Sequence, residues 1–285
     1  MQLVSSTSLY SVGLYPSACQ GGAISKDGLF VTEALVNTPS LQQVLVGLGP
    51  GGQVEREISI PDSQQIGSTV GVDPVTGTIY AAYAGEVFKV APDFSSVTVL
   101  PFSFGEDGGV AISSNGTVYV VDSSLGRIDV LNSTQTAIAS TIAAGTDPLG
   151  ISFGPGGTLY YTDGSYYGTN VCQIVGVNLS TGLQTVVESG LPELDSLDAA
   201  PDGSFYAATH GGDFLHLIGP TIQDVPQGDS VAGIAIDVAV PEPTTASLVI
   251  SVGLLLCQRS CRHRSRKTNR DGQNQKGRGG ISTEA

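Results

Sequence analysis

Three acidic residues, Glu33, Asp122 and Asp163, occupy one recurring position of a segment that the chain repeats five times. We predict that this position ends the second strand of each copy, and it carries Tyr83 and Thr209 in the other two copies. Carboxylate oxygens are the ligands that a hard cation such as Ca²⁺ prefers. If the copies surround one axis, these side chains meet at one rim and predict a cation site. The alternative is that each carboxylate accepts backbone hydrogen bonds in its own turn and only fixes local geometry.

The repeated segment is a pair of β-strand patterns joined by a tight turn. Its copies read GGAISKDGLFVTE, STVGVDPVTGTIYAAY, GGVAISSNGTVYVVD, PLGISFGPGGTLYYTD and SLDAAPDGSFYAAT. Their turn glycines are Gly28, Gly77, Gly116, Gly157 and Gly203, with spacings of 49, 39, 41 and 46 residues. Such glycines supply the positive φ that a short hairpin needs. The flanking β-branched and aromatic residues alternate with the period of two that a strand requires.

Two further strand patterns follow the turn motif in a unit, for example RIDVLN and IASTIAAG after the third copy. Each unit therefore has four strands in about 40 residues, the length of a propeller blade. A four-stranded sheet cannot bury both faces alone, so the units must pack on one another, and radial packing leaves only short edges. We predict an all-β fold, a β-propeller of four-stranded blades over residues 1–238. We expect six blades, the sixth beginning at Val231–Asp237 and completed by N-terminal residues; five or seven are the alternatives.

Charge divides the chain into two unlike parts. Up to Val240 it contains 4 Lys and Arg against 23 Asp and Glu, whereas the last 45 residues contain 8 basic and 3 acidic residues. We call the acidic part, residues 1–240, the body. It would repel a phosphate backbone, which argues against nucleic acid as a partner.

Motifs for other chemistries are weak or missing. The GxSxG pattern occurs once, as GISFG at residues 150–154, but inside a predicted strand and not at the sharp strand-to-helix turn of a serine hydrolase of that type. The stretch GLGPGG at residues 47–52 lacks the Lys and Ser/Thr of a phosphate-binding loop and is predicted to be a hairpin loop. His210 and His216 form only a weak pattern, and His210 is expected in an exposed loop. Cys19 and Cys172 are either buried thiols or a disulfide pair, and their spacing selects neither.

The repeats resemble those of NHL-type six-bladed propellers, most closely in GVAISSNGTVYVVD and next in GISFGPGGTLYYTD. This resemblance covers roughly residues 20–237 and implies a fold but no activity, because propellers support many functions. In the similar gluconolactonase group, a Glu, an Asn and an Asp hold a metal ion in the central channel. By that resemblance Glu33 and Asp163 would compare with two of the ligands, while no convincing Asn is found for the third.

The C-terminal part contains a motif, an apolar run and a basic cluster. Val-Pro-Glu-Pro at residues 240–243 precedes 12 small or apolar residues, Ala246 to Cys257. The basic cluster consists of Arg259, Arg262, Arg264, Arg266 and Lys267. As a helix the run would be about 18 Å long against a bilayer core of about 30 Å, and basic side chains can extend such a short span. We predict one short apolar helix in a sorting or anchor segment, residues 239–267, followed by a disordered polar tail, residues 268–285.

This order of parts resembles the PEP-CTERM sorting signal of exported bacterial proteins. The resemblance implies that Pro241, Glu242 and Pro243 are recognised by a membrane sorting enzyme, an exosortase. The resemblance also implies that this enzyme cleaves near the motif and transfers the protein to the cell envelope or extracellular matrix. The apolar run is shorter than is usual, and 18 residues follow the basic cluster where few are expected. That family also carries signal peptides, whereas MQLVSSTSLYSVGLY has no basic or apolar leader region, so we expect translation to begin upstream.

Two functions of different classes follow. The first is an exported, surface-anchored or matrix propeller that binds a protein or polysaccharide without catalysis and without a cofactor. The alternative is an exported metal-dependent hydrolase, similar to lactonases, that uses Glu33, Asp122 and Asp163 on a metal ion such as Ca²⁺. Convergence of these three carboxylates within about 5 Å of one point would favour the alternative.

Overall fold

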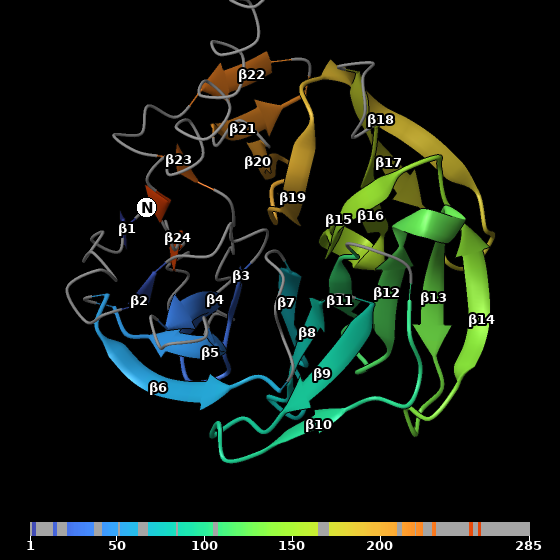
Figure 1. Cartoon of the computed structure of the whole chain (residues 1–285). Helices are drawn as coiled ribbons and strands as arrows, with labels where there is room; N and C mark the ends of the chain where they lie inside the picture. Colours follow the sequence, from blue (N-terminus) through green and yellow to red (C-terminus); the bar gives the residue numbers. More distant parts are fainter. Residues whose placement is uncertain are drawn as a thin grey trace, which may run out of the picture.

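The computed structural model describes residues 2–3, 14–15, 22–36, 42–50, 52–61, 68–83, 85–104, 108–164, 171–209, 213–219, 221–224, 230–231, 251–252 and 256–257. Within these ranges five antiparallel sheets are arranged around one axis, each as a blade (Figure 1). The fold is therefore a β-propeller of four-stranded blades, as the repeats predict.

Each blade follows the order of the chain from the axis outwards. The first contains β2 (Leu14–Tyr15) and β3 (Gly22–Ile24), which pair with the same edge of β4 (Phe30–Val36), then β5 (Gln42–Leu48) and β6 (Val54–Ser59). The second contains β7 (Ser68–Val72), β8 (Ile79–Tyr83), β9 (Glu86–Val90) and β10 (Val97–Val99). The third contains β11 (Val110–Ile112), β12 (Val118–Asp122), β13 (Arg127–Leu131) and β14 (Ile138–Ala143). The fourth contains β15 (Pro148–Phe153), β16 (Leu159–Asp163), β17 (Cys172–Val177) and β18 (Gln184–Leu191). The fifth contains β19 (Leu194–Ala199), β20 (Phe205–Thr209), β21 (Phe214–Ile218) and β22 (Thr221–Asp224).

Four two-residue strands come from the two ends of the chain. β1 (Gln2–Leu3) pairs in parallel with β24 (Ser251–Val252), and β23 (Ser230–Val231) pairs with β25 (Leu256–Cys257). In Figure 1, β1, β23 and β24 lie in the sector between the fifth and first blades. Apart from Val231, the predicted start of a sixth blade lies outside the described residues, so a sixth blade stays a prediction.

The residues of the predicted apolar helix that the structure describes are not helical. Ser251–Val252 and Leu256–Cys257 are extended because they pair with other strands, and the rest of residues 246–257 lies outside the described residues. Among the residues that are described, no helix is both long and apolar enough to cross a bilayer. The two short 3₁₀ turns in the described ranges are η2 (Ser123–Leu125) and η3 (Pro155–Gly157).

Hairpin turns between the first two strands follow the glycine pattern. Gly28, Gly77, Gly116 and Gly203 have φ values of 84°, 79°, 84° and 86°, a region that disfavours other residues. In the first and third blades, a serine hydroxyl before the glycine accepts the backbone N–H four residues on. The hairpin loop predicted at residues 47–52 is confirmed in part: β5 continues to Leu48, and the loop to β6 begins after that residue.

Among the described residues, four of the five clusters of buried apolar side chains pack between adjacent blades, and the fifth lies within the first blade. In β8, Ile79 and Ala81 face the first blade, while Tyr80 and Ala82 join a cluster with Val110 and other residues of the third blade. Two similar clusters join the third blade to the fourth and the fourth to the fifth. Successive strand side chains point to opposite faces, so a second strand buried on both faces must be apolar throughout. This explains sequences such as IYAAY and VYVVD.

The outermost strands carry irregularities that limit pairing with other chains. The pairing register shifts once along β6, once along β14 and twice along β18, which are six, six and eight residues long. The outermost strands without a shift, β10 and β22, are only three and four residues long. Bulges and short edges both protect an exposed edge from adding a further strand.

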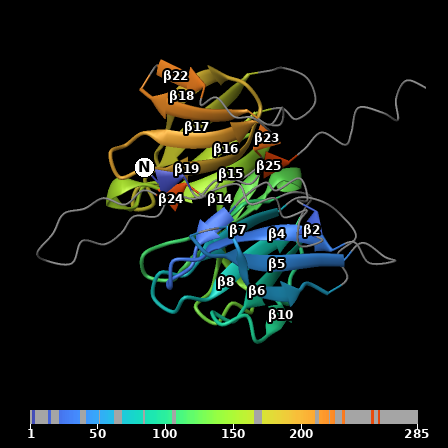
Figure 2. The ribbon, with the colours of Figure 1, turned by 90° about the vertical axis from the view of Figure 1, so that its left-hand side faces the viewer.

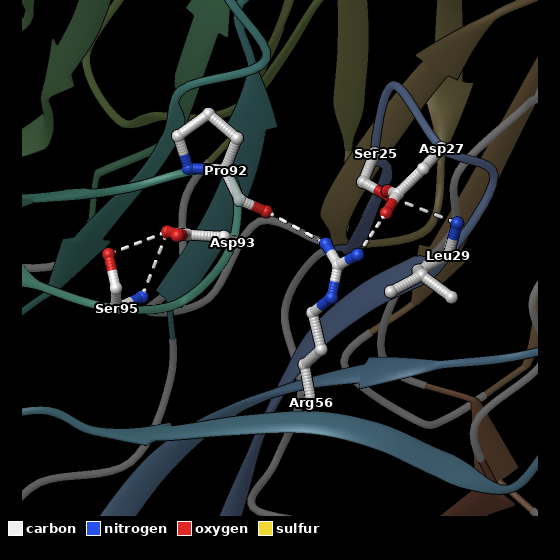
Figure 3. Close-up of polar contacts among 7 residues, drawn as sticks. All are labelled: Ser25, Asp27, Leu29, Arg56, Pro92, Asp93 and Ser95. Atoms are coloured by element: carbon white, nitrogen blue, oxygen red, sulfur yellow. Dashed lines mark hydrogen bonds and ion pairs between the residues drawn. The ribbon is translucent and has the colours of Figure 1, made fainter.

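Polar side chains also tie successive blades together. Arg56 of β6 forms an ion pair of 2.5 Å with Asp27 of its own blade and donates a hydrogen bond of 2.9 Å to the carbonyl of Pro92 in the second blade (Figure 3). Lys26 donates to the carbonyl of Val75, again from the first blade to the second. Lys89 of the second blade donates to Gln135 of the third. Three of the four basic residues before Val240 thus connect blades.

Replacing Arg56 by alanine should remove both of its contacts. We expect the free energy of unfolding to fall by about 0.5–1 kcal/mol, because the pair is partly exposed. Added salt should reduce this difference.

The pKa of Asp27 is held below its usual value, mainly by the hydrogen bond from Ser25 and also by Arg56. A carboxyl group whose pKa is lowered by folding stabilises the fold at pH values above its unfolded-state pKa. This stabilisation is lost as pH falls through the folded-state pKa. Denaturation curves of the two proteins should therefore converge in acid; a gap that widens there would contradict this.

Candidate functional site

The recurring acidic position ends the second strand in four blades and not in the first. Tyr83, Asp122, Asp163 and Thr209 are the last residues of β8, β12, β16 and β20, as predicted. Glu33 is instead the fourth of seven residues in β4, which continues to Val36 because its last two residues pair with β2. The prediction that Glu33 ends its strand is therefore wrong.

Asp122 is used within its own blade. Its side chain is almost fully buried and caps η2, accepting the backbone N–H of Leu125 at 3.2 Å and the hydroxyl of Ser124 at 2.9 Å. The Arg127 guanidinium lies 3.4 Å from its other oxygen. These contacts fix the turn between β12 and β13.

Asp163 fixes the entry of the chain into the fourth blade. Its carboxylate accepts the backbone N–H of Asp147 at 3.2 Å and the side-chain amide of Gln173 at 2.9 Å. A Cβ placed on Gly145 would lie 1.9 Å from the Asp163 carboxyl carbon, so the carboxylate fills the space beside that glycine. The side chain holds the segment before β15 against the end of β16.

Glu33 pairs across two strands of the first blade. It is 1 % exposed, and the Gln43 side-chain amide of β5 donates a hydrogen bond to it. The described residues contain no group of three or more His, Cys, Asp or Glu side chains placed to hold a metal ion. The structure therefore does not gather Glu33, Asp122 and Asp163 into the predicted cation site within this part of the chain.

One buried charge cluster was missed by sequence reasoning. Arg127 of β13 donates a hydrogen bond of 3.1 Å to one oxygen of Asp129, and its Nε lies 2.9 Å from the other oxygen without hydrogen-bond geometry. The Asp129 side chain is fully buried, and this burial raises its pKa. Alternate strand residues share a face, so the pair Arg127 and Asp129 could have been found from its spacing.

His216 takes part in a polar contact that differs from a nucleophilic triad. Its Nε2 lies 3.1 Å from the Ser204 hydroxyl, and its ring stacks on Tyr206 with centroids 4.1 Å apart. Ser204 donates its hydroxyl hydrogen to Asp202 at 2.7 Å. In a triad the histidine lies between the acid and the serine and removes the serine proton. Here the serine lies between the other two.

Several predicted residues lie outside the described residues. They are His210, Cys19, the sorting motif Pro241, Glu242 and Pro243, and the basic cluster at residues 259–267. Cys172 is described and is a free, buried cysteine, and its burial raises the pKa of the thiol to about 11.

Solved structures with similar backbones have several different activities. A nidogen/laminin complex has a TM-score of 0.59 and 13 % identity, over 77 % of this chain and 84 % of that chain. Virginiamycin B lyase from Staphylococcus aureus has a TM-score of 0.51 and 14 % identity, over 76 % and 73 %. A PQQ-bound aldose sugar dehydrogenase from Streptomyces coelicolor has a TM-score of 0.53 and 12 % identity, over 79 % and 86 %.

The chain shares their β-propeller fold. At such low identity the likeness concerns the fold alone, which is common to lyases, dehydrogenases and binding modules. No protein-family model matches the sequence, and no curated protein sequence does. The function must therefore be argued from this propeller's own residues.

Proposed function

We propose that this chain is an exported β-propeller, displayed at the cell surface or in the extracellular matrix, that binds a protein or polysaccharide without catalysing a reaction. The observation that supports this is how the recurring carboxylates are used. Asp122 caps a turn, Asp163 holds the entry to β15, and Glu33 pairs with Gln43. Asp122 and Asp163 thus hold loops in place, and rigid loops on a stable scaffold are common binding surfaces.

Export is proposed from the sequence of the C-terminal part. The motif at residues 241–243, the apolar run and the basic cluster stand in the order of a PEP-CTERM signal. An exosortase would recognise the motif while the apolar run holds the chain transiently in the membrane. The acidic body suits an exported protein, because excess acidic charge keeps proteins soluble.

Replacing Glu242 by alanine tests the sorting proposal, when both chains carry an N-terminal export signal and are produced in a bacterium that has an exosortase. We expect the variant to stay in the membrane fraction with its C-terminal part attached, while the original chain reaches the surface or medium with a smaller mass. Mass spectrometry of each fraction measures this. Glu284→Ala removes the same charge outside the motif and should be sorted normally. Equal masses and locations for the Glu242→Ala variant and the original chain would contradict the proposal.

The purified chain tests binding against catalysis. A glycan array and a pull-down from the extracellular material of the producing cells should give saturable binding. Incubation with lactones and Ca²⁺ should give no hydrolysis. Lactone hydrolysis that requires Ca²⁺ and disappears in an Asp163→Asn variant that still folds would instead establish the metal-dependent hydrolase.

A further inference from the structure

The outer rim of the third and fourth blades has no charged residue over two long stretches. Residues 132–146, which include β14, and residues 178–187, which include the first half of β18, contain no Asp, Glu, Lys or Arg. We call these two stretches the uncharged rim. β14 and β18 are the outermost strands of their blades (Figure 1), and the Gln184 side chain donates a hydrogen bond to the carbonyl of Ala143. The two strands therefore form one continuous surface.

This rim also exposes aliphatic side chains. Leu183, Val186 and Val187 are 65 %, 51 % and 42 % exposed, and Ile138 and Leu179 are exposed to a lesser degree. β18 carries one charged residue, the half-buried Glu188, whereas the outermost strand of the first blade, β6, carries Glu55, Arg56 and Glu57. Exposed aliphatic groups with few charges beside them mark a surface that gains free energy when it is covered.

Backbone geometry limits how the rim can be covered. Val186 pairs with Val175 and Glu188 with Ile174, so Val187 is an extra residue that interrupts the regular edge of β18. A second shift follows near Gly190, whose φ is 77°. Such bulges prevent a long strand from adding along this edge. A partner must therefore contact mainly the side chains, which favours a closed contact over an open-ended fibre.

Charge indicates which partner fits. The whole chain has a net charge of −14, and two copies repel each other in most orientations. The uncharged rim lets two copies meet with few opposed like charges, because Glu188 is the one charged residue of β14 and β18. β10 is also uncharged, but it is only three residues long. A basic partner would gain more from the acidic surfaces elsewhere. We propose that the uncharged rim is the contact surface of a two-fold homodimer, in which the same patch of each copy faces the other.

Sedimentation velocity of the full chain over a wide range of protein concentrations tests this. We expect a monomer–dimer equilibrium in which added salt strengthens the dimer, because salt screens the remaining repulsion between two acidic copies. Val186→Lys places a charge on the rim, opposite the same charge in the other copy. It should weaken the dimer by about tenfold or more, since like charges that face each other across a contact repel.

Val99→Lys is the matched control, because Val99 is 40 % exposed on β10, the outermost strand of the second blade. It should leave the dimer unchanged, and circular dichroism should show both variants folded. A chain that is monomeric at every concentration would overturn the proposal. Binding of a neutral glycan to the rim of such a monomer would not rescue it. A dimer that persists unchanged in Val186→Lys would place the contact on another surface and would overturn it equally.

Discussion

Replacing Arg127 by alanine is expected to lower the free energy of unfolding by about 3 kcal/mol. The substitution leaves two buried carboxylates, Asp122 and Asp129, without their neighbouring cation. Removing one partner of a buried ion pair costs about 3–5 kcal/mol, and the lower value is expected because the Arg127 side chain is 33 % exposed. Urea denaturation at neutral pH measures the change.

The dependence of this loss on pH separates buried charge from lost packing. Burial already raises the pKa of Asp129, and removing Arg127 should raise it further. A carboxyl with a raised folded-state pKa favours the fold when protonated and opposes it as pH rises through that pKa. The deficit of the variant should therefore shrink in acid. Adding Asp129→Asn to the variant should also restore part of the stability at neutral pH. A deficit independent of pH, with no recovery in the double variant, would assign the effect to packing.

Replacing Gly150 by valine is the second change with a large expected effect. A Cβ at Gly150, in β15, would lie 2.8 Å from the backbone nitrogen of Leu197 and 3.1 Å from the Cα of Ser196, both in β19 of the next blade. Backbone atoms cannot rotate away as a side chain can, so the fourth and fifth blades must separate. We expect a loss of at least about 2–3 kcal/mol, the upper part of the usual cost of overpacking, and a clearly lower melting temperature by calorimetry.

Gly176→Ala is the control for this effect. Its Cβ would meet only side-chain atoms, the nearest being a ring carbon of Tyr160 at 3.1 Å, and the ring can shift. The expected loss is within about 1 kcal/mol. If both variants lost equal stability, the close approach of β15 to β19 would not be the cause.

The fold followed from the sequence because its signals are local. Gly28, Gly77, Gly116 and Gly203 could be assigned to hairpin turns from their neighbours alone, and their positive φ values agree. The β-branched and aromatic residues of IYAAY and VYVVD likewise identified second strands. The broken inner strand of the first blade was not predicted, because β2 and β3 join only through pairing with β4. That pairing also placed Glu33 away from the end of its strand.

The candidate site was harder to predict because its geometry depends on contacts between distant residues. Asp122 and Asp163 look equivalent in the repeats, yet one caps η2 and the other holds the segment before β15. Their hydrogen-bond donors, such as Gln173, have no signature in the repeat. Charge counts identified an acidic body, but only the structure shows that Lys26, Arg56 and Lys89 connect blades.

That use of the basic residues has a consequence for proteolysis. A protease that cuts after lysine or arginine finds only four such bonds before Val240, and eight in the 45 residues that follow. Three of the four side chains hold neighbouring blades together and the fourth, Arg127, neutralises buried carboxylates. Such a protease can cut these peptide bonds only after the blades have opened, because the side chains that it must bind are engaged in contacts of the folded propeller. Digestion of the body by a trypsin-like enzyme would thus report the opening of the propeller itself.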